Sequence, residues 1–242
     1  MARSLISLSP RVEQRLQAWE NIHRLLGAQP VPRLRPTITL SRQFGCEGYP
    51  VAERVQALMA EATGEPWNVY DKVLLEAVAR DQGIALETLQ RLGETARSLE
   101  KLGVRPRQYH QHAEAFRAVA EKLQDFAAVG NAVIVGRGGA ALCRQQPNCF
   151  HFRVTAREAW RVETIARRLE VPLDEARGLV EANQSLREQF LREQLHVDPG
   201  DPALFDASFD NERGSVEAIA QAMVAYVRAA WTSRASRASR GT

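Results

Sequence analysis

Residues 37–52 are the stretch that most constrains how this chain of 242 residues can fold. A β-branched apolar run, Thr37-Ile38-Thr39-Leu40, precedes a loop with two glycines, and Pro50 then opens a helical pattern. Backbone N–H groups at a helix N-terminus lack intrahelical partners and lie at the positive end of the helix dipole. The stretch therefore predicts a strand, a turn that can hold a phosphate-sized anion, and a helix.

The loop differs from the common phosphate-binding loop. That motif reads G-x-x-x-x-G-K-[ST]; its Lys reaches the β- and γ-phosphates and its hydroxyl group binds Mg²⁺. Gly48, Tyr49 and Pro50 stand where those groups belong. Taken alone, the loop does not decide whether a nucleotide binds here.

Composition and charge are those of an ordinary soluble protein. The hydrophobic share is 45%, the charged share is 25% and the net charge is +3, with much of the excess basicity in the last residues. Whole-chain charge is therefore weak evidence for nucleic acid, and we expect no nucleic-acid partner. The three cysteines are odd in number and lack metal-type spacing, which favours a reducing compartment. With no apolar run long enough for a signal peptide or a bilayer span, we expect a cytoplasmic protein without a membrane partner.

An amphipathic helix is predicted ahead of the main domain. Apolar residues recur at intervals of three and four from Val12 to Leu26, and Ser9-Pro10 can begin the helix. Three prolines between positions 30 and 36 keep the next stretch extended. We therefore expect a helical arm with a Pro-rich linker over residues 1–36, docked on the main domain or on a partner; a homodimer through this arm is one hypothesis.

Strand and helix patterns alternate through the rest of the chain. Beyond the opening strand, strands are predicted at Trp67–Tyr70, Ala132–Val135, Cys149–Val154 and Phe205–Phe209, with a helical insertion from Ile84 to Val129 and a last helix from Val216 to Val227. Such alternation implies a parallel sheet covered on both faces. We predict an α/β doubly wound domain over residues 37–231, followed by a basic disordered tail over residues 232–242.

Two further features lie where a ligand would bind in such a sheet. Gly136-Arg137-Gly138-Gly139 follows a buried strand, and a guanidinium between glycines at a strand end suits a phosphate. A dinucleotide site is not favoured there, because the next strand ends without the acidic residue that such a site needs. Asp71 also follows a strand at this edge, although spacing alone favours a helix N-cap.

Arginines gather on two later helical stretches, at positions 157, 161, 167, 168, 187 and 192. The spacing places Arg157, Arg161 and Arg168 near one stripe of a helix. A cationic lid of this kind would neutralise charge on a moving phosphoryl group. For any single arginine we favour a solvated face paired with Glu158, Glu163, Glu170 or Glu193, whereas the set as a whole favours a lid.

Five motifs follow one another in a fixed order: Ile38–Gly45, Tyr70–Leu74, Val133–Gly138, Asn183–Phe190 and Asp201–Asp206. Together they resemble the successive motifs of the cytidylate kinase-like family, a divergent branch of the P-loop nucleoside monophosphate kinases. The resemblance covers roughly residues 37–227, and the fixed order makes it more specific than any one motif. It implies a P-loop NTPase-like doubly wound sheet, ATP as phosphoryl donor with Mg²⁺, and a nucleoside monophosphate, first of all CMP, as acceptor.

The resemblance also implies roles for particular residues. The phosphate loop would comprise Ser41, Arg42, Gly45, Cys46 and Gly48, although Cys46, Glu47 and Tyr49 replace a Ser, a Gly and an Arg of the family pattern. Asp71 and Arg137 would bind the monophosphate, Arg137, Arg161 and Arg187 would be the catalytic arginines, and Asp206 would lie near the donor base. No residue stands out as a metal ligand.

The substitutions in the loop leave two functions open. Glu47 puts a carboxylate where amides would face phosphates, which is unfavourable unless its side chain points away or holds a metal. Cys46 is either a thiol with a lowered pKa at a helix N-terminus or, as we favour, a small buried replacement for Ser. The main hypothesis is a nucleoside monophosphate kinase, and the sequence leaves open whether an unaligned lysine, such as Lys72 or Lys101, replaces the lost one. The alternative is a catalytically degenerate nucleotide-binding or regulatory protein that keeps the kinase fold. A third and weaker hypothesis is nucleic-acid binding through the arginine-bearing helices.

Overall fold

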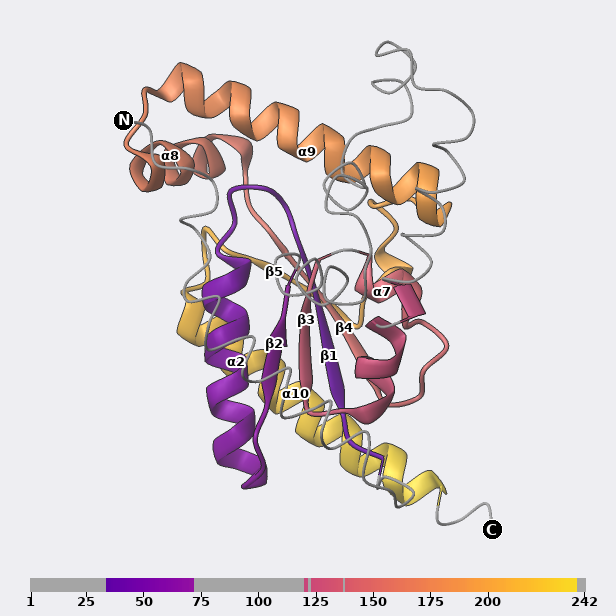
Figure 1. Cartoon of the computed structure of the whole chain (residues 1–242). Coiled ribbons are helices and arrows are strands. Elements are labelled where there is room, and N and C mark those ends of the chain that lie inside the picture. Colours follow the sequence, from indigo (N-terminus) through magenta and orange to yellow (C-terminus); the bar gives the residue numbers. More distant parts are fainter. Residues whose placement is uncertain (1–33, 72–119, 122, 137, 239–242) are drawn as a thin grey trace, which may run out of the picture.

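A five-stranded parallel sheet forms the centre of the structure, a computed structural model that describes residues 34–71, 120–121, 123–136 and 138–238 (Figure 1). The strands are β1 (Thr37–Arg42), β2 (Asn68–Tyr70), β3 (Ala132–Val135), β4 (Cys149–Thr155) and β5 (Ala207–Asp210). Their order across the sheet is β2-β3-β1-β4-β5, and every neighbouring pair is parallel. The predicted α/β doubly wound sheet is confirmed, with β1 at its centre.

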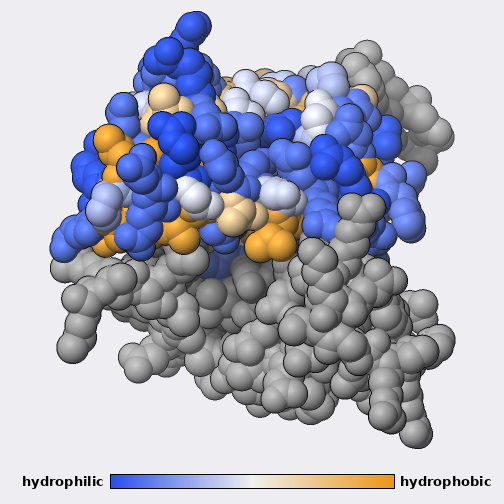
Figure 2. Space-filling model, turned by 90° about the horizontal axis from the view of Figure 1, so that it is seen from above, coloured by the Kyte–Doolittle hydropathy of each residue, from blue (hydrophilic) through white to orange (hydrophobic). Residues whose placement is uncertain are grey.

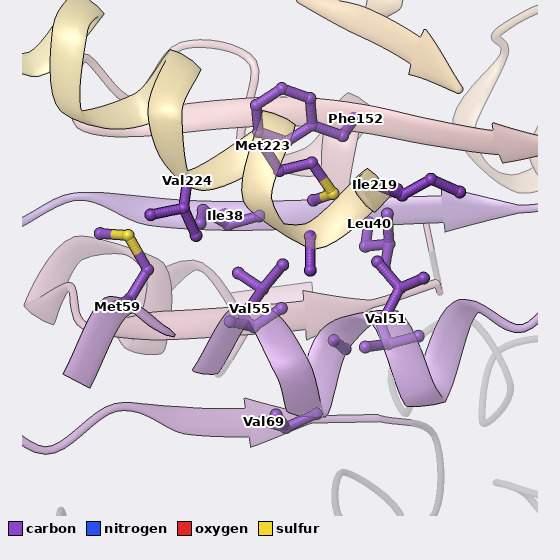
Figure 3. Close-up of a cluster of buried hydrophobic side chains, with 14 of the residues drawn as sticks. Ile38, Leu40, Val51, Val55, Met59, Val69, Phe152, Ile219, Met223 and Val224 are labelled. Carbon is purple, nitrogen blue, oxygen red and sulfur yellow. The ribbon is translucent and has the colours of Figure 1, made fainter. Parts of the chain in front are cut away.

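One face of the sheet packs on two long helices, α2 (Gly48–Thr63) and α10 (Val216–Ala238) (Figure 1). Alternate residues of the strands point to this face, so Ile38 and Leu40 of β1 lie in one buried cluster with Phe152 of β4. The helices contribute Val51, Val55, Met59, Ile219, Met223 and Val224 to that cluster (Figure 3). Burial of this apolar surface fixes the helix that follows the first glycine loop against the strand that precedes the loop.

The opposite face packs on shorter helical segments. Helix α7 (Gly139–Leu142) follows β3, and residues 123–129 are also helical, as predicted for the end of the insertion. The rings of Tyr70 and Phe126 stack with centroids 4.7 Å apart. On the same face the Thr37 hydroxyl donates to the Ala127 carbonyl at 2.8 Å. Both faces of the sheet are therefore covered, as the alternation of strands and helices indicated.

Two helices lie across the carboxyl ends of the strands: α8 (Glu158–Leu169) and α9 (Leu173–Leu195) (Figure 1). They pack on each other through a buried cluster that also holds Phe44, from the loop after β1. Seen from above, the described surface on this side is largely hydrophilic with a few hydrophobic residues (Figure 2). The helix pair is thus anchored to the first glycine loop and carries charged side chains outward.

The C-terminal end of the chain differs from the prediction. Helix α10 continues to Ala238, whereas composition indicated a disordered tail from residue 232. Arg234 Nη1 donates to the carbonyls of Pro147 and Cys149 at 2.8 and 3.0 Å, and its guanidinium lies 4.0 Å from the centroid of the Phe150 ring. These tertiary contacts hold the extra helical turns, and composition alone does not reveal them.

Several predictions lie outside the described residues: the N-terminal helix, most of the helical insertion, Lys72, Lys101 and Arg137. Strand β5 begins two residues later than expected, because Pro202–Leu204 forms a 3₁₀ turn that Asp201 caps. None of the helices in the described part of the chain has both the length and the apolar character needed to cross a bilayer.

Candidate active site

Both glycine loops leave the sheet at the same edge. Strand β1 ends at Arg42 and β3 ends at Val135, and the two strands are paired, with Leu40 opposite Val135. Residues 43–47 then lead into α2, while Gly136 begins the turn toward α7. The carboxyl edge of a parallel sheet, where neighbouring strands turn to opposite sides, is the place where ligands bind in α/β folds.

The first loop is held in a shape that requires glycine at position 45. Gly45 has φ +97°, and a Cβ atom there would lie 2.7 Å from Cβ of Arg161 and 2.9 Å from its carbonyl oxygen. A non-glycine residue would therefore meet both backbone strain and a clash with α8. Within the loop, the Cys46 N–H donates to the Gln43 carbonyl at 3.3 Å and closes a tight turn.

Two glutamines anchor this loop to the surrounding elements. The Gln43 side-chain oxygen accepts from the Ala156 N–H at 3.0 Å, at the start of the segment that leads to α8. The Phe44 N–H donates to the side-chain oxygen of Gln184 on α9 at 2.9 Å. The sequence did not single out either glutamine, because an uncharged side chain gives no signal until the fold places it beside a backbone amide from a distant segment.

The two predicted lid arginines that the structure describes both lie at the loop. Arg161, 6% exposed, donates from Nη1 to the Phe44 carbonyl and from Nε to the Ala156 carbonyl, each at 3.2 Å. Arg187 donates from Nη1 to the Arg42 carbonyl at 3.4 Å, and its guanidinium lies 5.1 Å from the centroid of the Phe44 ring. The structure thus brings both arginines to the first glycine loop, where they donate to the carbonyls of Phe44 and Arg42.

Glu47 points away from the interior of the loop. Its carboxylate forms an ion pair with Arg168 of α8 at 2.9 Å, and Asn211 Nδ2 lies 3.4 Å from its other oxygen. The Glu47 N–H donates to Asn211 Oδ1 at 2.7 Å. Of the two alternatives left open by the sequence, the ion pair with Arg168 supports the outward orientation.

The arginine stripe on α8 is present, but the pairing expected for it is wrong. Arg157 pairs with Glu212, and Arg168 pairs with Glu47, so both partners lie on other elements rather than among the four glutamates suggested by the sequence. Glu158 pairs with Arg177 of α9 at 3.6 Å. These ion pairs depend on contacts between helix α8 and the loops at the edge of the sheet. The spacing of residues along one helix cannot predict such contacts.

Cys46 is a buried thiol with a raised pKa. Its side chain is 8% exposed, and burial raises the pKa from 9.0 to about 11 although Arg161 and Arg187 act in the opposite direction. The thiolate is therefore absent at neutral pH. The hypothesis of an activated cysteine is wrong, and the small buried replacement for Ser is the interpretation that stands.

Three further predicted site residues, Ser41, Asp71 and Asp206, do not all lie at the same end of the strands. Asp71 is buried, 6% exposed, directly after β2, and Ser41 lies near the carboxyl end of β1, opposite Arg153. Asp206 precedes β5, and its carboxylate accepts from the His151 N–H at 2.6 Å and from the Tyr226 hydroxyl at 3.3 Å. The structure therefore brings Ser41 and Asp71 to the edge of the sheet that carries the glycine loops. Asp206 lies at the other end of its strand, before the first residue of β5 and beside His151.

The described residues offer no ready-made site for a metal ion. No group of three or more His, Cys, Asp or Glu side chains that could hold one occurs among them. Mg²⁺ in nucleotide sites usually has one or two carboxylates and several phosphate and water ligands. A Mg²⁺ ion that arrives with a nucleotide needs no such cluster, and we derive no step through this ion.

A parallel sheet with a central first strand, a glycine loop leading from that strand into a helix, and arginine-bearing helices over the carboxyl edge define the P-loop kinase-like class of α/β proteins. The chain belongs to the cytidylate kinase-like family, whose sequence profile matches residues 37–213. The resemblance noted in the sequence is thus confirmed.

The chain is similar to several solved structures, and the first of these supports the fold. An uncharacterized protein from Eubacterium ventriosum has a TM-score of 0.58 at 19% identity, covering 81% of this chain and 99% of the other. A shikimate kinase from Acinetobacter baumannii, solved with shikimate, has 15% identity and a TM-score of 0.41, with 81% and 94% of the two chains covered. A shikimate kinase from Bacteroides thetaiotaomicron has 10% identity and a TM-score of 0.44, with 80% and 98% covered. No curated protein matches the chain.

Proposed function

We propose that this protein transfers the γ-phosphoryl group of ATP to a nucleoside monophosphate, with CMP as the first candidate acceptor. The observation that carries the proposal is the glycine loop at the carboxyl edge of the central strand, with two lid arginines in contact with it, in a chain of the cytidylate kinase-like family. Phosphoryl transfer needs mainly positioning and charge neutralisation, which such an arrangement can supply.

Each element of the site has a proposed part. The amides of Gly45 and Gly48, in the loop and at the N-terminus of α2, would hold the donor phosphates. Asp71, together with Arg137 from outside the described residues, would bind the acceptor. Arg161 and Arg187 would position the loop and add positive charge near the transferred group, and Mg²⁺ would enter with the nucleotide. Asp206 stays a proposal for the donor-base side, from the family resemblance alone.

A coupled assay with ATP, Mg²⁺ and CMP, dCMP or UMP tests the activity. We expect turnover with at least one acceptor and a loss of about 10²–10³-fold in kcat for Arg187→Met, by analogy with removal of one charge-stabilising group. Arg177→Met on the same helix is the matched control, because Arg177 is 54% exposed and pairs with Glu158 away from the loop. Absence of turnover above a blank, with ATP binding intact, would reject the kinase.

A second function, nucleotide binding without transfer, is favoured by a specific feature of the loop. Tyr49 and Pro50 replace the Lys and hydroxyl of a P-loop, and Asn211 already accepts the hydrogen bond of the Glu47 amide. Isothermal titration with ATP and Mg²⁺ separates the two functions. Tight binding without turnover indicates a sensor, and no binding indicates a scaffold for another partner.

A homodimer through the N-terminal arm and a cytoplasmic location complete the proposal. Light scattering on the full chain and on a variant that lacks residues 1–33 tests the dimer. A dimer that persists in the shortened variant would place the interface elsewhere.

A further inference from the structure

The side chain of Arg42 passes between the two glycine loops. Its methylene stem lies on Gly48, where an added Cβ atom would be 2.8, 3.1 and 3.2 Å from Cγ, Cβ and Cδ of Arg42. Its guanidinium lies on Gly136, where an added Cβ would overlap Nη1 and lie 2.8 Å from Cζ. Arg42 is the last residue of β1, so the guanidinium reaches from the central strand across to the loop after β3.

The path of the Arg42 side chain requires glycine at positions 48 and 136. Any Cβ at position 48 or 136 would collide with the arginine, and Gly136 also has φ +77°, which other residues rarely adopt. The Arg42 side chain therefore occupies the space that a Cβ atom would need at either glycine. The result is a positive charge held at the carboxyl edge, between the loop proposed for the donor phosphates and the loop that carries Arg137.

The other described arginines near the loop have different tasks. Arg161 and Arg187 donate to the carbonyls of Phe44 and Arg42. The carboxylates of Glu47 and Glu212 neutralise Arg168 and Arg157. Lysine occurs only at positions 72, 101 and 122 of the sequence, and none of these lies in the loop.

We propose that Arg42 is the phosphate-binding cation of this protein and takes the place of the lysine that a P-loop carries after its second glycine. The inference rests on the proposed function and names a residue for it. In this protein the cation comes from the strand before the loop, whereas in a P-loop it comes from the start of the helix after the loop. The Arg42 guanidinium lies between the two glycine loops. A guanidinium can also donate two parallel hydrogen bonds to a phosphate, where an ammonium acts as a point charge.

Three substitutions at position 42, Arg42→Met, Arg42→Lys and Arg42→Gln, test the assignment. Met keeps the aliphatic stem that packs on Gly48 but removes the positive charge. Lys keeps both the stem and the charge, and Gln is a second uncharged substitution. Arg157→Met is the matched control, because Arg157 is 79% exposed and pairs with Glu212. Each full-length variant is assayed for kcat and KM, for binding of ATP and of inorganic tripolyphosphate by calorimetry, and for thermal stability.

We expect Arg42→Met and Arg42→Gln to lower kcat/KM by about 10²–10³-fold and to weaken tripolyphosphate binding by at least tenfold, as removal of a charge-stabilising donor does elsewhere. Arg42→Lys should recover most of the binding, and the control should match wild type. A purely structural role would instead lower thermal stability and leave tripolyphosphate affinity unchanged in the folded fraction.

The outcomes separate this inference from the proposed function. Active wild type with position-42 variants within threefold of it overturns the assignment of Arg42 and leaves the kinase standing. If wild type binds tripolyphosphate without turnover, the proposed kinase activity is rejected. The tripolyphosphate affinities of the position-42 variants then still test whether Arg42 binds phosphate. Wild type that binds no polyphosphate overturns both.

Discussion

At the scale of single residues, the site shows how a charge that opposes phosphate binding can be compensated. Glu47 lies in the loop, yet its carboxylate is paired with Arg168 and touches Asn211. Both charged side chains are about a quarter exposed, 28% and 25%, so solvent screens the pair only in part. The loop therefore presents less negative charge to an incoming phosphate than its sequence suggests.

Removing either partner of this pair should change phosphate affinity in opposite directions. Arg168→Ala leaves the Glu47 charge uncompensated, so we expect ATP to bind about tenfold more weakly, which corresponds to about 1.4 kcal/mol. Glu47→Gln removes the negative charge, so we expect ATP to bind several-fold more tightly. Isothermal titration at low salt measures both, and equal affinities for the two variants would refute this account of the loop.

Cys46 should make stability depend on pH in the alkaline range. The unfolded thiol ionises near pH 9.0, while burial keeps the folded thiol neutral up to about pH 11. The contribution is therefore fully present below pH 9 and is lost as the pH rises from 9 to 11, on the order of 2 kcal/mol in total. Urea unfolding at pH 8 to 10.5 should show a steeper loss for wild type than for Cys46→Ser. Parallel curves would contradict the buried thiol.

At the scale of elements, helix α9 connects the two glycine loops. Gln184 and Arg187 contact the loop after β1, and one to two turns further along, Leu191 and Leu195 lie over Gly138. Gly138 has φ +71°, and an added Cβ would overlap Cδ1 of Leu195. The same helix face thus constrains both loops.

The contact between α9 and the second loop can be tested by adding one methyl group. Gly138→Ala should lower the free energy of unfolding by about 1–3 kcal/mol, from backbone strain and from the clash with Leu195. Leu195→Ala should restore part of the loss that comes from the clash, which a double-mutant cycle by urea denaturation measures. Additive effects of the two changes would mean that the side chains do not meet.

The last turns of α10 should contribute to stability. Arg234→Ala removes two hydrogen bonds to the carbonyls of Pro147 and Cys149 and a contact with the Phe150 ring. We expect a loss of about 1–2 kcal/mol in unfolding free energy. Arg228→Ala, an exposed position on the same helix, is the control and should be near neutral. A neutral Arg234→Ala would favour the disordered tail that composition indicated.

At the scale of the whole molecule, local patterns predicted most elements and the fold. The structure places Arg161 and Arg187 at the first glycine loop, and their role as lid arginines stays a prediction. Strands β1 and β3 could be predicted because a strand buried on both faces has a continuous apolar run, and the glycines after each run predicted the loops. The contacts of Gln43, Gln184 and Asn211 could not be predicted, since each joins segments more than a hundred residues apart. The direction of Glu47 and the path of Arg42 depend on the same long-range packing.

The central claim is that the loop after β1, together with Arg42, holds the phosphates of a nucleotide. A crystal structure with a non-hydrolysable ATP analogue tests it most directly. We predict phosphate oxygens within hydrogen-bond distance of the amides of Gly45 and Gly48 and of the Arg42 guanidinium, with the Glu47 carboxylate still directed at Arg168. An analogue whose phosphates lie away from this loop would contradict the account.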